Sequence, residues 1–242
     1  MMRRGYRCKE DALSYLINCY EDVVTKGFQG DYLEAVKCFE SVSETKIRRD
    51  LNQFYKNFRS ADQAWKTCKG VLYEYAVFKA IKQVIDNSQL RNSLQVVRGR
   101  EVDTYRDQIV IRNWNDILPD VDLLIVDKNN QLVKAIASCK TSLRERLTET
   151  AFWKRELEKY VNTKNIKIMF ITIDKDGELK NESNRYIILH VIDYVIITDP
   201  TRYESLIKSY RKKYGGRRDF NFLVEKIKRV DDMETLLSEL VK

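Results

Sequence analysis

The sequence predicts an α/β protein in which helices flank a mixed central sheet, preceded by a helical N-terminal region. Apolar residues recur at three- and four-residue spacing from residue 11 to about residue 85, as in amphipathic helices. Short runs rich in Val, Ile and Leu follow between residues 122 and 197, with one helical pattern among them. Only 8 Gly and 2 Pro occur in 242 residues, which argues against a sandwich rich in tight turns.

Composition indicates a chain that folds and has no membrane-spanning segment. Hydrophobic residues make up 43% of it, enough for a core and too many for wholesale disorder. No uncharged apolar run approaches the ~18 residues that a membrane span needs, and the first residues lack the apolar region of a secretory signal. We therefore expect a soluble, intracellular protein.

Cysteine and histidine usage restricts the chemistry. The 5 cysteines form no CxxC pair, so reduced, buried thiols are expected rather than disulfides or a zinc site. The single histidine, His190, lies in a strand-like run and is expected to be a core or edge residue. One histidine excludes Ser/His, Cys/His and multi-His zinc catalysis. Any catalysis must come from carboxylates and lysines.

The elements are predicted in order from local patterns. Residues 11–85 should form three or four helices, and residues 94–114 irregular strands. Residues 122–127 form a short apolar run, residues 128–131 are turn formers, and residues 132–139 form a second apolar run. The three segments together predict a β-hairpin.

A helix and two strands should complete the sheet. Ser142 and Glu145 match a capping box, so a helix of about five turns should begin at Ser142. Residues 166–173 should form a strand, and residues 186–197 a long strand covered on both faces. A helix with a basic face should run from residue 200 to 214, with two short helical stretches after it.

The predicted hairpin brings acidic residues and a lysine to one end. Its turn places Asp122 opposite about Ala137, and side-chain alternation lets Asp120, Asp122, Ser138 and Lys140 share a face. Carboxylates bind hard cations such as Mg²⁺ through oxygen, and a lysine can position or deprotonate an attacking water. This combination can cleave phosphodiesters.

These residues resemble the PD-(D/E)XK nuclease superfamily, and specifically its type II restriction endonucleases. Pro119-Asp120 and separations of 20 and 18 residues from Asp120 and Asp122 to Lys140 are similar to the family motif. The run from Ser138 to Arg146 resembles the segment in which the catalytic lysine leads into an arginine-bearing helix. Residues 65–74 resemble the helix that supplies an additional glutamate, here Glu74.

The resemblance implies a restriction-endonuclease-like fold and a specific activity. That activity is Mg²⁺-dependent, sequence-specific cleavage of double-stranded DNA to 5′-phosphate ends. Asp122 would bind the metal with Asp120 or Glu74, and Lys140 would orient the water. A homodimer is expected on a palindromic site, and the same system should encode a DNA methyltransferase that protects the host.

One departure from the family motif concerns the acid two residues before the lysine, which is Ser138 here. Some restriction enzymes with Ser at this position look similar and carry the carboxylate on the following helix. Glu149 and Glu156, two turns apart, are the candidates, because the capping box already accounts for Glu145. The sequence does not choose between them.

Two groups of cations are candidates for DNA contact. Arg144 and Arg146 fall in the first turn of the predicted helix, where a nearby anion would offset the unfavourable dipole. The alternative is pairing with Glu145 or Glu149. Residues 208–218 carry six cations and no acid, and contact with the DNA backbone competes there with simple solvation. The candidates in this run are Lys212, Lys213, Arg217 and Arg218.

We therefore expect three segments. They are a helical region 1–64 for dimerisation or DNA grip, a catalytic core 65–200, and a basic helical segment 201–242. Two other functions stay open: a junction resolvase or repair nuclease on the same core, and a DNA-binding protein whose catalytic site has decayed.

Overall fold

The computed structural model describes residues 8–112, 114–143 and 145–241. The chain divides into two compact units, Met1–Ala80 and Ile81–Lys242. No helix in the described ranges is long and apolar enough to cross a membrane.

The first unit is helical, as the spacing of apolar residues predicts. Its helices are α1 Glu10–Gly27, α2 Tyr32–Lys37, α3 Phe39–Val42, the π-helix η1 Ser43–Ile47, the 3₁₀ helix η2 Arg48–Phe54 and α4 Phe58–Asn87. The 30-residue helix α4 continues into the second unit. The fully buried aromatic rings of Tyr20, Phe39 and Tyr73 contact one another in series and form the centre of this unit.

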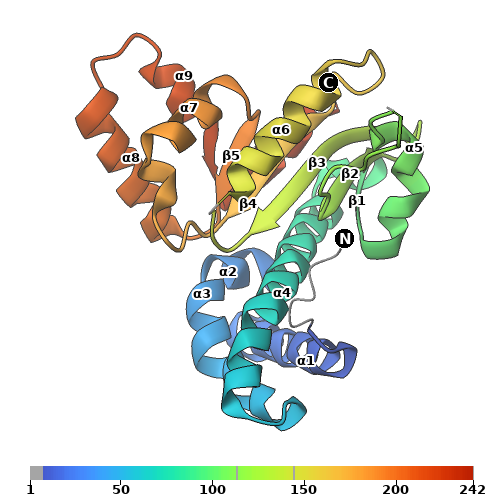
Figure 1. The fold of residues 1–242 in the computed structure, drawn as a ribbon, viewed down its shortest axis with the longest axis vertical. Coiled ribbons are helices and arrows are strands. Elements are labelled where there is room, and N and C mark those ends of the chain that lie inside the picture. The colour runs from blue at the N-terminus through green and yellow to red at the C-terminus, as the bar shows by residue number, and fades with distance from the viewer. Residues whose placement is uncertain (1–7, 113, 144, 242) are drawn as a thin grey trace. The chain divides into compact units, whose positions relative to one another are not determined.

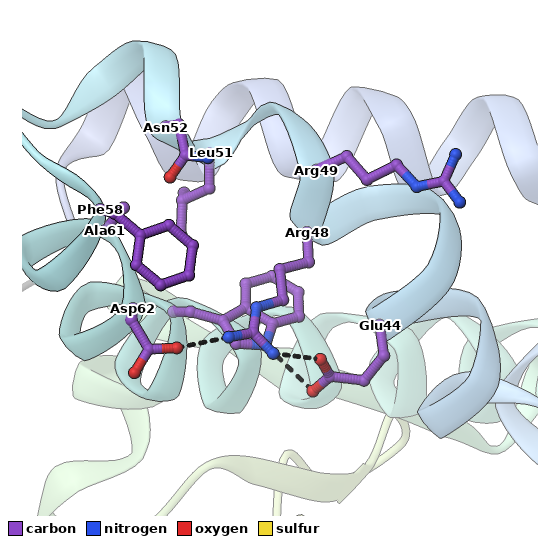
Figure 2. Close-up of a pocket in the computed structure, with 9 residues that line it drawn as sticks. Glu44, Arg48, Arg49, Leu51, Asn52, Phe58, Ala61 and Asp62 are labelled. Carbon is purple, nitrogen blue, oxygen red and sulfur yellow. Dashed lines mark hydrogen bonds and ion pairs between the residues drawn. The ribbon is translucent and has the colours of Figure 1, made fainter.

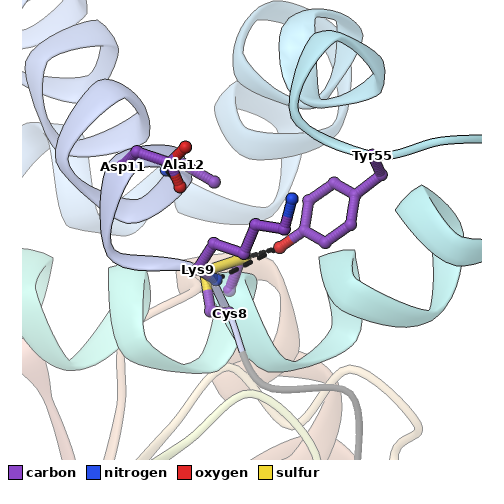
Figure 3. Close-up of a disulfide and its surroundings, with 6 residues drawn as sticks. Cys8, Lys9, Asp11, Ala12 and Tyr55 are labelled. Atoms are coloured by element: carbon purple, nitrogen blue, oxygen red, sulfur yellow. Dashed lines mark hydrogen bonds between the residues drawn. A yellow bond between two sulfur atoms is a disulfide. The ribbon is translucent and has the colours of Figure 1, made fainter.

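The expectation that all cysteines are reduced is wrong, because Cys8 and Cys68 form a disulfide (Figure 3). Their Cα atoms lie 4.9 Å apart across a sequence separation of 60, a proximity that no local spacing reveals. The backbone N–H of Lys9 donates to the Tyr55 hydroxyl at 3.2 Å, which also fixes this segment. Cys19, Cys38 and Cys139 carry thiols.

A cavity of about 220 Å³ lies in the first unit, between η2 and the start of α4 (Figure 2). Trp65 forms part of its wall and donates from Nε1 to Glu44 at 3.0 Å. Arg48 lies between the carboxylates of Glu44 and Asp62 and pairs with both, so its charge is compensated. The cavity is lined by none of the residues proposed for catalysis from the sequence.

The second unit contains the mixed sheet that the sequence predicts (Figure 1). Its strands are β1 Leu94–Arg98, β2 Leu123–Asp127, β3 Val133–Lys140, β4 Lys167–Thr172, β5 Tyr194–Ile197 and β6 Ile227–Arg229, in that spatial order. The first three strands pair antiparallel, and β3 to β6 pair parallel. The predicted hairpin is β2–β3.

The hairpin contains a β-bulge that shifts its register. Leu123 pairs with Ala137 and Ile125 with Ala135, but Val126 pairs with Val133, which leaves Lys134 as an extra residue on β3. The prediction of Asp122 opposite Ala137 is therefore wrong by one position, because it assumed a regular ladder. Asp122 lies across from Ser138.

Helices cover one face of this sheet. They include α6 Arg146–Glu158, α7 Glu182–His190, α8 Pro200–Tyr214 and α9 Phe220–Glu225. Leu147, Ile188, Leu206 and Leu223, one from each helix, join a core cluster with Phe170 of β4. Figure 1 shows α6 lying across the strands with α7, α8 and α9 beside it.

The remaining helices of the unit are η3 Gln89–Asn92, η4 Gly99–Tyr105, α5 Arg106–Ile109, η5 Glu178–Lys180, η6 Val230–Asp232 and α10 Met233–Glu239.

Two sequence-based element boundaries are wrong. The run 186–197 is not one strand: α7 ends at His190, and β5 begins at Tyr194. Ile188 and Leu189 are buried on the helix, whereas His190 is exposed and not in the core. Helix α6 begins at Arg146 instead of Ser142, and its N-cap residue Glu145 makes no side-chain capping hydrogen bond.

Two further segments differ from the prediction. In the described part of residues 94–114, where irregular strands were expected, β1 and an isolated bridge between Ile111 and Ile117 are strand-like, and α5 lies between them. The C-terminal stretch, expected to be only helical, contributes β6 at the sheet edge.

Candidate active site

The site predicted from the sequence assembles at the end of the hairpin opposite its turn. Lys140 Nζ lies 2.8 Å from Oδ2 of Asp122 and 3.2 Å from Oδ2 of Asp120. Asp120 and Asp122 precede β2, and Lys140 is the last residue of β3. The structure thus brings together the two carboxylates and the ammonium.

Backbone hydrogen bonds hold Asp122 in place. Its N–H donates to the Ala137 carbonyl at 3.3 Å, and its Oδ2 accepts from the Cys139 N–H at 2.6 Å. The side chain of Asp122 is only 8% exposed and that of Lys140 17%, whereas Asp120 is 48% exposed. Asp122 is therefore the anchored ligand candidate, and Asp120 the more solvated one.

Burial sets the electrostatics of Asp122. Desolvation raises the pKa of its carboxyl above the ordinary value. The Lys140 ammonium and the Cys139 amide oppose this rise, and the neighbouring Asp120 carboxylate adds to it. A proton therefore competes for this oxygen pair more strongly than for an exposed aspartate.

Ser138 stands where the family motif carries an acid. It is 2% exposed, and its hydroxyl has no hydrogen-bond partner within the described part of the chain. Because β3 alternates, Ser138 and Lys140 lie on the same face, toward Asp122 across the ladder.

The other candidate acids lie on two helices. On α6, Glu149 pairs with Arg146 at 2.8 Å, and the pKa of that guanidinium is raised chiefly by this bond and also by the charge of Asp120. Glu156, two turns on, pairs with Lys159 at 2.5 Å. Glu74 is on α4 in the first unit, whereas Asp122 belongs to the second unit.

Within the described part of the second unit, no third acidic side chain joins Asp120 and Asp122. Among the described residues, no three His, Cys, Asp or Glu side chains gather at metal-binding distance. Mg²⁺ usually retains several waters and is held by one or two carboxylates together with substrate phosphate. Two carboxylates with hard oxygen donors fit that preference.

The candidate DNA-contact residues fall in two places. Arg146 begins α6 on the side of the site, as its electrostatic interaction with Asp120 indicates; Arg144 lies outside the described residues. Lys212 and Lys213 are in the last turn of α8, where cations also favour the helix dipole. Arg217 and Arg218 follow in the turn before α9, and all four of these side chains are exposed.

Sequence reasoning missed one buried carboxyl group. Asp174, just after β4, is 2% exposed, has a φ of 52° and accepts from the Leu179 N–H at 3.3 Å. Desolvation raises its pKa from 3.8 to about 6. The DKDG run suggests only a polar loop, yet Asp174 fixes the chain between β4 and η5.

The chain is similar to known restriction endonucleases. Residues 101–223 match the family model of the BsaWI restriction endonuclease, type 2. A Methanocaldococcus jannaschii protein provisionally named type II restriction enzyme MjaVIP is 27% identical over 168 residues, 63% of this chain and 74% of that protein. A Helicobacter pylori protein provisionally named type II restriction enzyme HpyAORF263P is 31% identical over 114 residues, 43% of this chain and 59% of that protein.

The fold is also similar to a solved structure. The restriction endonuclease PspGI in complex with substrate DNA superposes with a TM-score of 0.65 at 16% identity, over 93% of this chain and 92% of that one. This likeness confirms the predicted architecture of a mixed sheet flanked by helices.

Proposed function

The chain belongs to the BsaWI family of type II restriction endonucleases and is a site-specific deoxyribonuclease, and we propose that it cleaves both strands of its DNA site in a Mg²⁺-dependent reaction that leaves 5′-phosphate ends. The observation that carries this proposal is the convergence of Asp120, Asp122 and Lys140 at one end of the β2–β3 hairpin. Asp122 and Lys140 are mostly buried, whereas Asp120 is about half exposed and accessible to a substrate from solvent.

The acidic and basic residues of the site have different roles. Asp122 and Asp120 hold the cation, with Glu74, Glu149 or Glu156 as a third acidic group. A bound Mg²⁺ supplies charge neutralisation at the scissile phosphate and lowers the pKa of a bound water. Lys140, held within 3.2 Å of both aspartates, orients the attacking water and donates to the phosphate oxygens. Arg144 contacts the DNA, as does Arg146 at the start of α6, and Lys212, Lys213, Arg217 and Arg218 hold its backbone.

The assembly follows from the substrate. A palindromic site presents two strands related by a two-fold axis, which a homodimer matches. Residues 1–64 form the dimer interface or grip the DNA, residues 65–200 form the catalytic core, and residues 201–242 form a basic flank. A DNA methyltransferase of the same specificity protects the host genome.

Plasmid digestion tests this function. Discrete fragments with 5′-phosphate ends, formed with Mg²⁺ and absent with EDTA, are expected. Cleavage only of branched duplexes would indicate a resolvase. The serine at position 138 and the two-acid site favour one further candidate, a DNA-binding protein with a decayed site. Binding without cutting at any Mg²⁺ or Mn²⁺ concentration would indicate that alternative.

A further inference from the structure

The buried hydroxyl of Ser138 has a role that packing does not explain. It is 2% exposed, and Oγ has no hydrogen-bond partner among the residues that the structure describes. A buried hydroxyl without a partner destabilises a fold. If this position only filled space between strands, alanine would serve better, as it does at the neighbouring Ala137 and Ala135, which are both fully buried.

The polar groups nearest to this hydroxyl in the sheet are those of the candidate active site. One position beyond the pair of Leu123 and Ala137, Asp122 lies across the antiparallel ladder from Ser138. Cβ atoms of such partners are about 4.5–5.5 Å apart. On the other side of β3, the register partner of Ser138 is the buried, apolar Phe170. The polar groups nearest to the Ser138 hydroxyl are therefore those of Asp122 and Lys140.

The hydrogen bonds of Asp122 explain why the Ser138 hydroxyl does not pair with it. The Cys139 N–H and the Lys140 ammonium both donate to Oδ2. Oδ2 therefore already accepts two hydrogen bonds, and the Ser138 hydroxyl pairs with neither oxygen of this carboxylate. The hydroxyl and the carboxylate thus border one site without consuming each other.

A cation held by two carboxylates keeps coordinated water, and that water is a strong hydrogen-bond donor that needs acceptors. We propose that Ser138 is a positioning residue of the cation site, whose hydroxyl accepts a hydrogen bond from the hydration water of a divalent cation held by Asp120 and Asp122. This inference rests on the proposed function. Ser138 replaces a charged ligand with a neutral acceptor and keeps negative charge away from the buried Asp122.

The test measures cation affinity of the full-length protein without DNA. Mn²⁺, a paramagnetic substitute for Mg²⁺, is titrated into wild type, Ser138→Ala and Ser138→Asp, with bound metal followed by electron paramagnetic resonance. Loss of an outer-shell partner typically weakens metal binding ~10- to 100-fold. We expect at least ~10-fold weaker binding by Ser138→Ala, with a metal-free melting temperature equal to or above that of wild type.

Two more variants complete the design. Ser138→Asp places a carboxylate in the same direction and should bind Mn²⁺ more tightly than wild type, while its metal-free form melts lower. Ser43→Ala is the matched control, because Ser43 is a fully buried serine of the first unit whose hydroxyl donates to the Glu40 carbonyl at 3.1 Å. It should lose stability and keep the wild-type affinity.

The outcomes separate this inference from the proposed function. If wild type binds Mn²⁺, Asp122→Asn abolishes that binding and Ser138→Ala binds as tightly as wild type, the role of Ser138 is wrong and the cation site stands. If wild type binds no Mn²⁺, the cation site and the role of Ser138 are both wrong.

Discussion

Lys140 and Asp122 are ion-paired, with Nζ 2.8 Å from Oδ2, although 18 residues separate them in the chain. They meet because β2 and β3 run antiparallel, so that the start of β2 and the end of β3 lie at the same end of the hairpin. Both side chains are mostly buried, so removing either one leaves the other as a poorly compensated charge. Tests of their catalytic role must therefore measure folding alongside activity.

Lys140→Ala and Asp122→Ala should abolish cleavage and leave DNA binding intact. Each change removes several kcal/mol of transition-state stabilisation, as expected for a water-orienting ammonium or a metal ligand. Plasmid cleavage, gel-shift binding and thermal melting of each variant check this expectation. Lys134→Ala is the matched control, since Lys134 is on the same strand and its Nζ lies 3.6 Å from Asp127 at the turn end. Wild-type cleavage by both site variants would refute the assignment.

The third acidic group should be revealed by comparing three glutamates. Of Glu149→Gln, Glu156→Gln and Glu74→Gln, at least one should reduce Mg²⁺-dependent cleavage by ~10²-fold. Glu149→Gln should have the larger effect of the two α6 variants, because Glu149 pairs with Arg146, whose guanidinium interacts electrostatically with Asp120, whereas Glu156 pairs with Lys159. Single-turnover rates at several Mg²⁺ concentrations measure it. Normal cleavage by all three would mean that the two aspartates suffice.

The arginines near α6 and the lysines of α8 should differ in whether their DNA contacts depend on sequence. If Arg146 or Arg144 contacts a base edge, its alanine variant should lose ~1–3 kcal/mol at the cognate site and little on random DNA. Lys212→Ala with Lys213→Ala should weaken binding to every sequence and flatten the salt dependence. Binding curves for cognate and random duplexes over a salt series decide. Equal losses on both duplexes for each arginine would assign the arginines to the backbone.

Asp174→Asn should stabilise the protein at neutral pH. Burial raises the pKa of Asp174 to about 6, above the unfolded value of about 3.9. The folded state then prefers the protonated carboxyl, so its stability contribution is fully present below about pH 4 and is lost as pH rises through about 6. Asparagine keeps an acceptor for the Leu179 N–H and tolerates the positive φ.

The stabilisation by Asp174→Asn should reach at most about 3 kcal/mol at pH 7.5 and nearly vanish at pH 4. Urea unfolding at both pH values measures it. Equal free-energy differences between wild type and variant at the two pH values would contradict the raised pKa. Asp176→Asn, on the exposed part of the same loop, is the control and should change little.

The sequence revealed those parts of the molecule that local patterns determine. The hairpin was predictable because two apolar runs flank the turn formers Lys128–Asn129–Asn130–Gln131. The boundary between α7 and β5 was not, since Ile187, Ile188 and Leu189 favour either state and only packing against the sheet decides. The Cys8–Cys68 disulfide depends on a distance that only the fold sets. The sequence did not identify the third acidic residue, because the distance from each glutamate to the aspartates depends on how the helices pack against the sheet.

The extra residue at Lys134 determines which chain-length changes the enzyme can tolerate. If Lys134 were paired with Ile125 and not bulged, the regular ladder would place Ser138 and Lys140 on the face opposite Asp122. Deleting Lys134 keeps Leu123 paired with Ala137, because Lys134 has no partner on β2. The pairs from Ile125 and Ala135 onward are then unchanged. Deleting Ile136 shifts everything after it by one position and turns the lysine away from the aspartates. Relatives should therefore vary in length between residues 127 and 134, and keep one fixed length from residue 135 to residue 140.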